Sequence, residues 1–139
     1  MRDLYDNINV LQVLAPQTAT SAKTSAAIDL QGYNSALVTF AVGAPGDTLS
    51  SSVYWTLSLQ ESTDGVTYTP VMANSAPDVN NTVSIALTAN GQGNQAYKLG
   101  YIGSARYLKA LATPTGTMTN GTPISMVALR GTAGYSPVS

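Results

Sequence analysis

Hydrophobic and polar residues alternate over short runs along most of this chain, and clusters of Gly, Pro, Asn and Ser separate the runs. Alternation with a period of two residues is typical of half-buried β-strands, and helical periodicity is almost absent. The pattern predicts about nine strands, at a spacing typical of sandwiches and barrels. Their expected ranges are residues 8–14, 26–30, 35–42, 53–61, 66–72, 82–88, 95–102, 106–113 and 124–130.

The clusters between the runs predict turns rather than domain linkers, because none is long enough to separate two domains. A chain of 139 residues has the length of one domain. We therefore expect an all-β fold, an antiparallel β-sandwich of jelly-roll type with about eight or nine strands. The sandwich is expected over residues 21–139, and residues 1–20 form either an N-terminal arm or its first strand.

The segment YWTLSLQESTDGVTYTPVM, residues 54–72, contains the only tryptophan of the chain. Trp55 is either a core residue or part of a platform that binds sugars. Alternate residues of a strand share a face, so Trp55 lies in register with Leu57 and Leu59, which favours the core. Asp64-Gly65 predicts a hairpin turn in which the glycine supplies a positive φ. Glu61, at the strand end, is expected to be a solvated or turn-capping carboxylate.

Two predicted strands are apolar on both faces. In 35–42 and in 124–129, hydrophobic residues occupy even and odd positions alike. Strands covered on both sides have this composition. The second cover is a loop, the N-terminal arm or another subunit, and two such strands in one chain favour an oligomer.

The segment 95–112 is rich in tyrosine and predicts a hairpin with its turn at Gly103-Ser104. Tyr97 and Tyr101 share one face of the first strand, where their rings are expected to pack inward. The returning strand begins with Arg106 and Tyr107. Tyrosine and arginine are enriched at the energetic centres of protein interfaces, so these two residues are also candidates for a contact with a partner.

Charged residues make up 9% of the chain, with six basic and seven acidic residues and a net charge of -1. Typical soluble domains have about 25%. Binding to a phosphate backbone needs clustered cations, so six scattered ones argue against a nucleic-acid partner. No apolar run approaches the length of a membrane span, and no targeting segment is visible. A surface of low charge favours association and indicates either a protein of an assembly or a low-charge β domain.

The side chains needed for catalysis are scarce. The chain has no cysteine and no histidine, which excludes thiolate chemistry and the commonest general base. A nucleophilic serine lacks a base, and the acids show no convergent pair. Calcium ligands at Asp47, Asp64 or Asp78 lack the spacing of a ligand loop. We expect a protein that is not an enzyme and that holds no cofactor and no metal.

Three segments, in order, carry a resemblance: IDLQGYNSALVTFAVG (28–43), LSLQESTDGVTYTPV (57–71) and LGYIGSARYLKA (99–110). They resemble small structural proteins of tailed-bacteriophage virions, namely head decoration or cement proteins and relatives encoded beside the major capsid protein. The resemblance implies a β-rich protein without catalysis that sits on or in the virion, without specifying which part of it. We expect this protein to be made in the bacterial host cytoplasm and to bind and stabilise the outer surface of the capsid. The implied partners are the major capsid protein and further copies of the chain, as a homotrimer.

Two rival functions remain, a neck or tail component of the same particle and a carbohydrate-binding module with exposed Tyr54 and Tyr107. For a capsid partner, the expected contacts are the apolar N-terminal residues and the exposed aromatic and arginine positions. An apolar N-terminal segment needs a surface to lie on, unless it is a strand of the sandwich. The contact residues predicted are Leu4, Tyr5, Ile8, Val10, Leu11, Tyr54, Arg106 and Tyr107.

Overall fold

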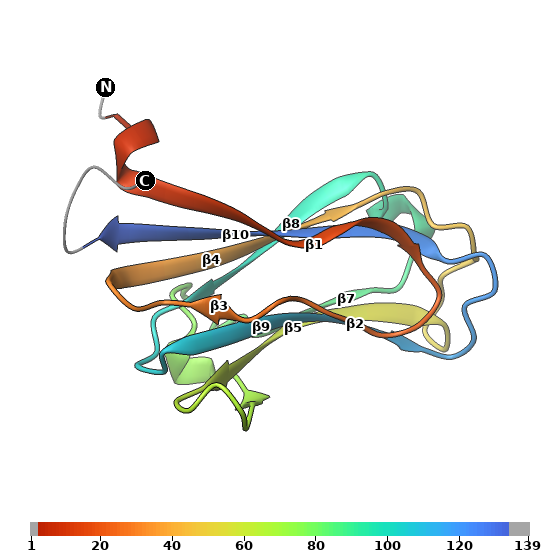
Figure 1. Ribbon diagram of the computed structural model, residues 1–139. Helices are drawn as coiled ribbons and strands as arrows, with labels where there is room; N and C mark the ends of the chain where they lie inside the picture. The colour runs from red at the N-terminus through yellow and green to blue at the C-terminus, as the bar shows by residue number, and fades with distance from the viewer. Residues whose placement is uncertain (1–2, 134–139) are drawn as a thin grey trace.

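The computed structural model describes residues 3–133 and consists of two antiparallel β-sheets packed face to face (Figure 1). The first sheet has the strand order β1-β10-β4-β8, and the second has the order β2-β9-β5-β6, with β3 on β9 and β7 on β5. The predicted all-β sandwich is confirmed. The strands of the first sheet are β1 (Ile8–Ala19), β10 (Thr122–Ala133), β4 (Tyr33–Val42) and β8 (Gln95–Tyr101). Those of the second are β2 (Lys23–Thr24), β3 (Ile28–Asp29), β9 (Tyr107–Thr115), β5 (Tyr54–Ser62), β6 (Thr69–Pro70) and β7 (Ser84–Leu87).

The strand order is that of a jelly roll. β2 and β3 pair with β9 one after the other and act as one interrupted edge strand. Without the two-residue β6, eight strands remain, taking β2 and β3 as one. In chain order, one sheet then holds the first, eighth, third and sixth strands, and the other holds the second, seventh, fourth and fifth. Two interlocked Greek keys of this kind define the jelly roll.

Several boundaries differ from the sequence prediction. The strand expected at 8–14 continues to Ala19, past register shifts at Leu14 and Gln17, so most of the N-terminal segment is the first strand of the sandwich. The strand expected at 66–72 shrinks to β6 because the hairpin before it is long. Short 3-10 turns occupy η1 (Tyr5–Asn7), η2 (Ala73–Ser75) and η3 (Asn90–Gln92).

The hairpin predicted over 95–112 is wrong. β8 pairs with β4 in the first sheet, whereas β9 pairs with β5 in the second, so the Gly103-Ser104 connection crosses between the sheets. Alternation correctly predicts which side chains of each strand point inward, but it does not identify the strand with which each one pairs. The inward direction of the rings is confirmed, since Tyr101 is 2% exposed and Tyr97 packs against the core.

Trp55 belongs to the core. Its side chain is fully buried, as are those of Leu57 and Leu59 two and four residues on. The indole Nε1 donates a hydrogen bond to Thr122 Oγ1 at 3.0 Å, which joins β5 of the second sheet to the first residue of β10. A buried indole N–H that finds a partner avoids the desolvation penalty of an unpaired donor.

The hairpin turn at Asp64-Gly65 is confirmed. Gly65 has a φ of +76°, and the Asp64 carboxylate accepts hydrogen bonds from the backbone N–H groups of Val66 and Thr67. Glu61 differs from its expected role as a solvated or capping group. Its carboxylate accepts a hydrogen bond from the Tyr101 hydroxyl of the opposite sheet.

Candidate interaction surfaces

The outer face of the first sheet carries a row of apolar side chains across three strands. Val10 of β1 pairs with Leu129 of β10, and Leu129 pairs with Leu37 of β4. Their neighbours along β10 and β4, Ala128 and Val38, are buried in the core, so alternation directs the row outward. Val127 lies one position away on the same face. We call Val10, Leu37, Val127 and Leu129 the apolar stripe.

The row explains why two strands are apolar on both faces. β4 and β10 are neighbours in the centre of the first sheet, and their outward leucines lie directly opposite each other. Val10 is 57% exposed, and the other three side chains of the apolar stripe are half-buried. No segment among residues 3–133 lies over them as a second layer (Figure 1).

The outer face of the second sheet is mostly polar, with Leu111 of β9 as an aliphatic exception opposite Ser58. On β5 the outward residues include Thr56, Ser58 and Gln60, and on β9 they include Lys109 and Thr113. Cross-strand pairs there join Thr56 to Thr113 and Gln60 to Lys109. The two outer faces of the sandwich therefore differ in polarity.

Residues at the N-terminus add exposed apolar side chains before β1. Leu4 and Tyr5 are 67% and 87% exposed, in and before η1. The Asp3 carboxylate accepts a hydrogen bond from the Tyr5 N–H at 2.9 Å and orders this turn. Ile8 is half-buried at the start of β1, on the same face as Val10. Leu11 lies on the other face and packs against the core, so its side chain does not join this surface.

Arg106 and Tyr107 lie near each other but far from the apolar stripe. The Arg106 guanidinium forms a bidentate ion pair with Asp29, with Nε–Oδ1 and Nη2–Oδ2 distances of 3.0 and 2.9 Å. This pair holds the pKa of Asp29 well below its usual range, at about 2. The guanidinium carbon is 4.9 Å from the centre of the Tyr107 ring. The Arg106 guanidinium and the Tyr107 ring thus already have partners within the protein, next to β3 at the edge of the second sheet.

Tyr54 is separated from that cluster. It pairs with Thr115, whereas Tyr107 pairs with Ser62 at the opposite end of the same ladder. Eight residues of strand separate Tyr54 from Ser62, which corresponds to about 26 Å. Tyr54 and Tyr107 therefore do not form one row of aromatic rings of the kind that a linear glycan would need.

The sequence reasoning missed a second cation–ring contact beside Tyr107. The Lys109 ammonium lies 4.2 Å from the centre of the Tyr68 ring, and burial raises the pKa of the Tyr68 hydroxyl. The hairpin around Gly65 approaches the Tyr107 ring closely. These contacts fasten the hairpin to the second sheet. No sequence signal pairs the two segments, because Lys109 lies 41 residues after Tyr68 and Tyr107 lies 42 residues after Gly65.

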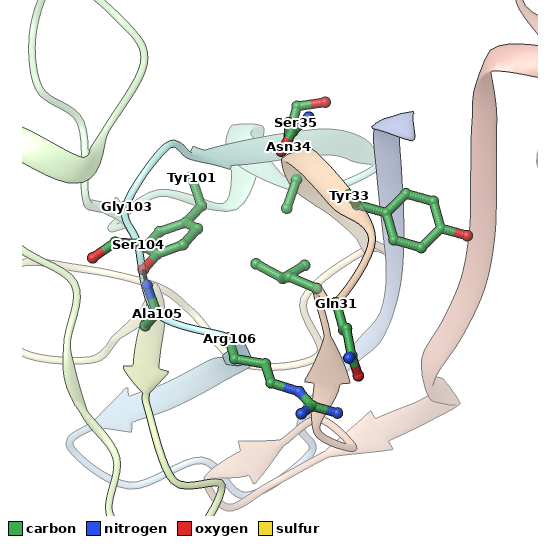
Figure 2. A pocket seen from close by; sticks show the side chains of 11 residues that line it. Gln31, Tyr33, Asn34, Ser35, Tyr101, Gly103, Ser104, Ala105 and Arg106 are labelled. Carbon is green, nitrogen blue, oxygen red and sulfur yellow. Dashed lines mark hydrogen bonds between the residues drawn. The ribbon is translucent and has the colours of Figure 1, made fainter. Parts of the chain in front are cut away.

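A cavity of about 330 Å³ opens at the end of the sandwich where the two sheets separate (Figure 2). Two segments line it, residues 30–36 at the start of β4 and residues 101–106 between β8 and β9. Figure 2 shows Tyr101 and Ser104 on one side, Asn34 and Ser35 above, and Arg106 below. We call it the end cavity. No sequence pattern predicts the end cavity, because neither segment alone carries a binding motif.

The described part of the chain contains neither a cluster of metal-ligating residues nor a helix that could cross a membrane. Within residues 3–133, no three acidic residues gather closely enough to hold a metal ion. In the same range, no helix has the length and hydrophobicity needed to cross a membrane.

No protein-family model matches the chain, and no curated protein matches its sequence. Among solved structures, a pilus protein of Bacillus endospore appendages is 17% identical, with 91% of this chain and 89% of that chain covered and a TM-score of 0.48. The SPBc2 prophage-derived protein YomS is 10% identical, with 88% and 93% covered and a TM-score of 0.49. A chain of tomato aspermy virus is 12% identical, with 99% and 85% covered and a TM-score of 0.44. At this level of similarity, function must be argued from the residues of the chain itself.

Proposed function

We propose that this chain is a structural protein of a phage virion that binds the outside of the capsid and stabilises it, as decoration or cement proteins do. The observation that carries the proposal is the difference between the two outer faces of the sandwich. One bears the apolar stripe, and the other is mostly polar, with Leu111 as an aliphatic exception. The three segments that resemble virion structural proteins supply the kind of assembly.

The apolar stripe is the centre of the proposed contact with the major capsid protein. Leu37 and Leu129 lie on central strands of the sheet, so their backbone is held on both sides and their side chains are preorganised. Burial of apolar surface stabilises a complex by about 25 cal/mol per Å² before the entropy cost of association. Specific interfaces bury about 1,600 Å² in total, so the apolar stripe needs surrounding contacts.

Leu4, Tyr5 and Ile8 supply those surrounding contacts in this proposal. Leu4 and Tyr5 are exposed before β1, and Ile8 lies half-buried on the same face as Val10. Deletion of residues 1–7 leaves β1 intact, whereas a longer deletion removes an edge strand. We expect the short deletion to weaken capsid binding without unfolding the sandwich. Unchanged binding would remove the N-terminal residues from the interface and leave the apolar stripe as the contact.

Further copies of the chain are the second partner in the proposal. A homotrimer around a symmetry axis of the shell places several weak contacts in one assembly, and multivalency then raises the total affinity. Light scattering of the isolated protein over a range of concentrations tests this part. A monomer at every concentration, together with isolated monomers on the capsid, contradicts the trimer.

Copy number per purified particle tests the function itself. Decoration of a symmetric shell predicts on the order of one copy per one to three major capsid subunits. About a dozen copies would indicate a vertex, neck or tail component, since a particle has few such positions compared with its many capsid subunits. Absence of the chain from the particle would overturn the proposal.

A further inference from the structure

We propose that the end cavity binds a neutral, hydroxyl-rich small molecule, of the class of a terminal sugar residue of a glycan. The site is distinct from the apolar stripe and from Tyr54 and Tyr107. It lies between the sheets, at the end where β4 begins and β8 ends (Figure 2). A volume of about 330 Å³ is at the lower end of the range for small-molecule sites.

The wall formed by residues 101–105 is rigid before any ligand arrives. The Tyr101 hydroxyl accepts a hydrogen bond from the Ala105 N–H at 3.0 Å and donates one to the Glu61 carboxylate. The chain then wraps the ring so closely that a Cβ at Gly103 would lie 2.4 Å from the hydroxyl oxygen. This wall therefore loses little conformational entropy on binding.

The opposite wall is fixed in the same way. The Tyr33 N–H donates to the Leu30 carbonyl at 3.0 Å, which closes the turn, and the Leu30 N–H donates to the Arg106 carbonyl at 2.8 Å. The Asp29 carboxylate also accepts a hydrogen bond from the Gln31 N–H at 2.9 Å. Backbone bonds between the two walls set the width of the end cavity.

Three side chains at the rim have hydrogen-bonding capacity to spare. Gln31, Asn34 and Ser104 are exposed, and within residues 3–133 their side chains form no hydrogen bond to the protein. Two amides and a hydroxyl offer both donors and acceptors, which is the combination that matches the hydroxyl groups of a sugar. Leu30 and Ala36 supply apolar lining for the C–H groups of such a ring.

The charge of the site favours a neutral ligand. Arg106 is the only charged residue that lines the end cavity. Its Nε and Nη2 groups are both bound to the Asp29 carboxylate, so the pair carries no net charge. The nearby Arg130 guanidinium lies against the Tyr33 ring and donates hydrogen bonds to the Asp29 carbonyl and to Asn9 Oδ1, so it too is already engaged. An anionic ligand would have to compete with that carboxylate for the guanidinium. A neutral sugar avoids this competition and uses the amide and hydroxyl groups instead.

The test is a titration of the full, isotopically labelled chain with neutral monosaccharides (glucose, galactose, mannose and N-acetylglucosamine) and with sialic acid as the anionic comparison. Amide chemical shifts report the position of binding. We expect saturable shifts confined to residues 30–36 and 101–106 for at least one neutral sugar, with a dissociation constant of about 1 mM or weaker.

The double variant Gln31→Ala/Asn34→Ala removes two rim amides that have no structural partner. We expect it to keep the fold and to weaken binding by about five- to a hundred-fold, from two lost hydrogen bonds of ordinary strength. Gln60→Ala, on the outer face of the second sheet, is the matched control and should bind as the original chain does. The titration contains no capsid, so the absence of sugar binding would not argue against the proposed virion function. In the same way, the absence of capsid binding would not argue against a sugar site in the end cavity.

Three results would overturn the inference. The first is no saturable shift with any neutral sugar at tens of millimolar. The second is a set of shifts around Tyr54 or Tyr107 in place of the end cavity. The third is a preference for sialic acid over every neutral sugar, which would contradict the charge argument.

Discussion

Tyr101 and Glu61 are hydrogen-bonded to each other across the sandwich, from β8 of the first sheet to β5 of the second. The ring of Tyr101 is 2% exposed, and its hydroxyl also accepts the Ala105 N–H. One side chain thus ties together both sheets and the segment that crosses between them. The neighbouring end of the sandwich, including the end cavity, depends on this bond for its shape.

Tyr101→Phe should destabilise the fold more than other hydroxyl deletions. It leaves a carboxylate and a backbone N–H without their partner, and we expect a loss of about 1.5–3 kcal/mol in the free energy of unfolding. Denaturation in urea measures it. Tyr97→Phe is the matched control, because its hydroxyl donates only to the neutral Gln92 carbonyl, at 2.6 Å. Equal losses of unfolding free energy in the two variants would show that the charged acceptor Glu61 stabilises the fold no more than a neutral carbonyl does.

Alkaline pH should weaken the same tie. Burial, followed by the hydrogen bond to Glu61, raises the pKa of Tyr101 to about 12 from its ordinary value of 10.0. The folded state therefore retains this proton more strongly than the unfolded state does. Its contribution to stability is complete below pH 10 and is lost as the pH rises towards 12. Denaturation at several alkaline pH values should show a steeper decline for the original chain than for Tyr101→Phe.

Acid should remove the contribution of Asp29. The Arg106 guanidinium, together with the Gln31 N–H, lowers the pKa of Asp29 from 3.8 to about 2. A depressed folded-state pKa gives stability that is present above pH 3.8 and is lost as the pH falls towards 2. Both side chains are more than 40% exposed, so solvent screening keeps the effect to about 1 kcal/mol or less. Asp29→Asn should flatten the stability profile in this pH range, and an unchanged profile would contradict the assignment.

Trp55 should report the core and not the surface. Its fluorescence emission is expected to be blue-shifted and unresponsive to a soluble quencher, since the side chain is fully buried. Thr122→Val keeps the shape but removes the acceptor of the indole N–H. We expect this variant to lose about 1–3 kcal/mol in urea denaturation. A quenchable Trp55 in the folded chain would argue against the packing described above.

Substitutions in the apolar stripe should separate binding from folding. Leu37→Gln and Leu129→Gln change half-buried side chains on an outer face, so both variants are expected to fold. Co-sedimentation with capsids lacking the protein should show at least tenfold weaker binding for the pair, equivalent to about 1.4 kcal/mol. Leu111→Gln makes the same chemical change on the outer face of the second sheet. If Leu111→Gln weakens binding as much as the pair does, the contact face is misassigned.

Much of the fold could be predicted from alternation, and the pairing of the strands could not. The inward direction of Trp55, the turn at Gly65 and the two apolar faces of β4 and β10 all follow from patterns within a single strand. The jelly roll depends on contacts far apart in the chain. The Gly103-Ser104 segment has the composition of a hairpin turn yet crosses between the sheets, because Tyr101 and Leu108 bury their side chains from opposite layers.

For the candidate surfaces, too, the sequence predicts features within one segment but not those that depend on contacts between distant segments. Leu4, Tyr5 and Val10 are exposed. Leu11, predicted as a contact with them, packs against the core instead, because hydrophobicity alone does not distinguish the two faces of a strand. The end cavity was unforeseen, since it exists only where residues 30–36 meet residues 101–106.

The pairing of β1 with β10 joins Ile8 to Gly131 and Ala19 to Thr122. A nascent chain leaving the ribosome therefore exposes the apolar residues of β1 and β4 until β10, more than 100 residues after the start of β1, has been synthesised. Sandwiches dominated by such distant pairings fold in milliseconds to seconds. During that interval β4 has a free edge on the side that β10 later occupies. Truncated or stalled products of this gene would thus be prone to aggregation, and a cell that makes many copies would need chaperones to shield them.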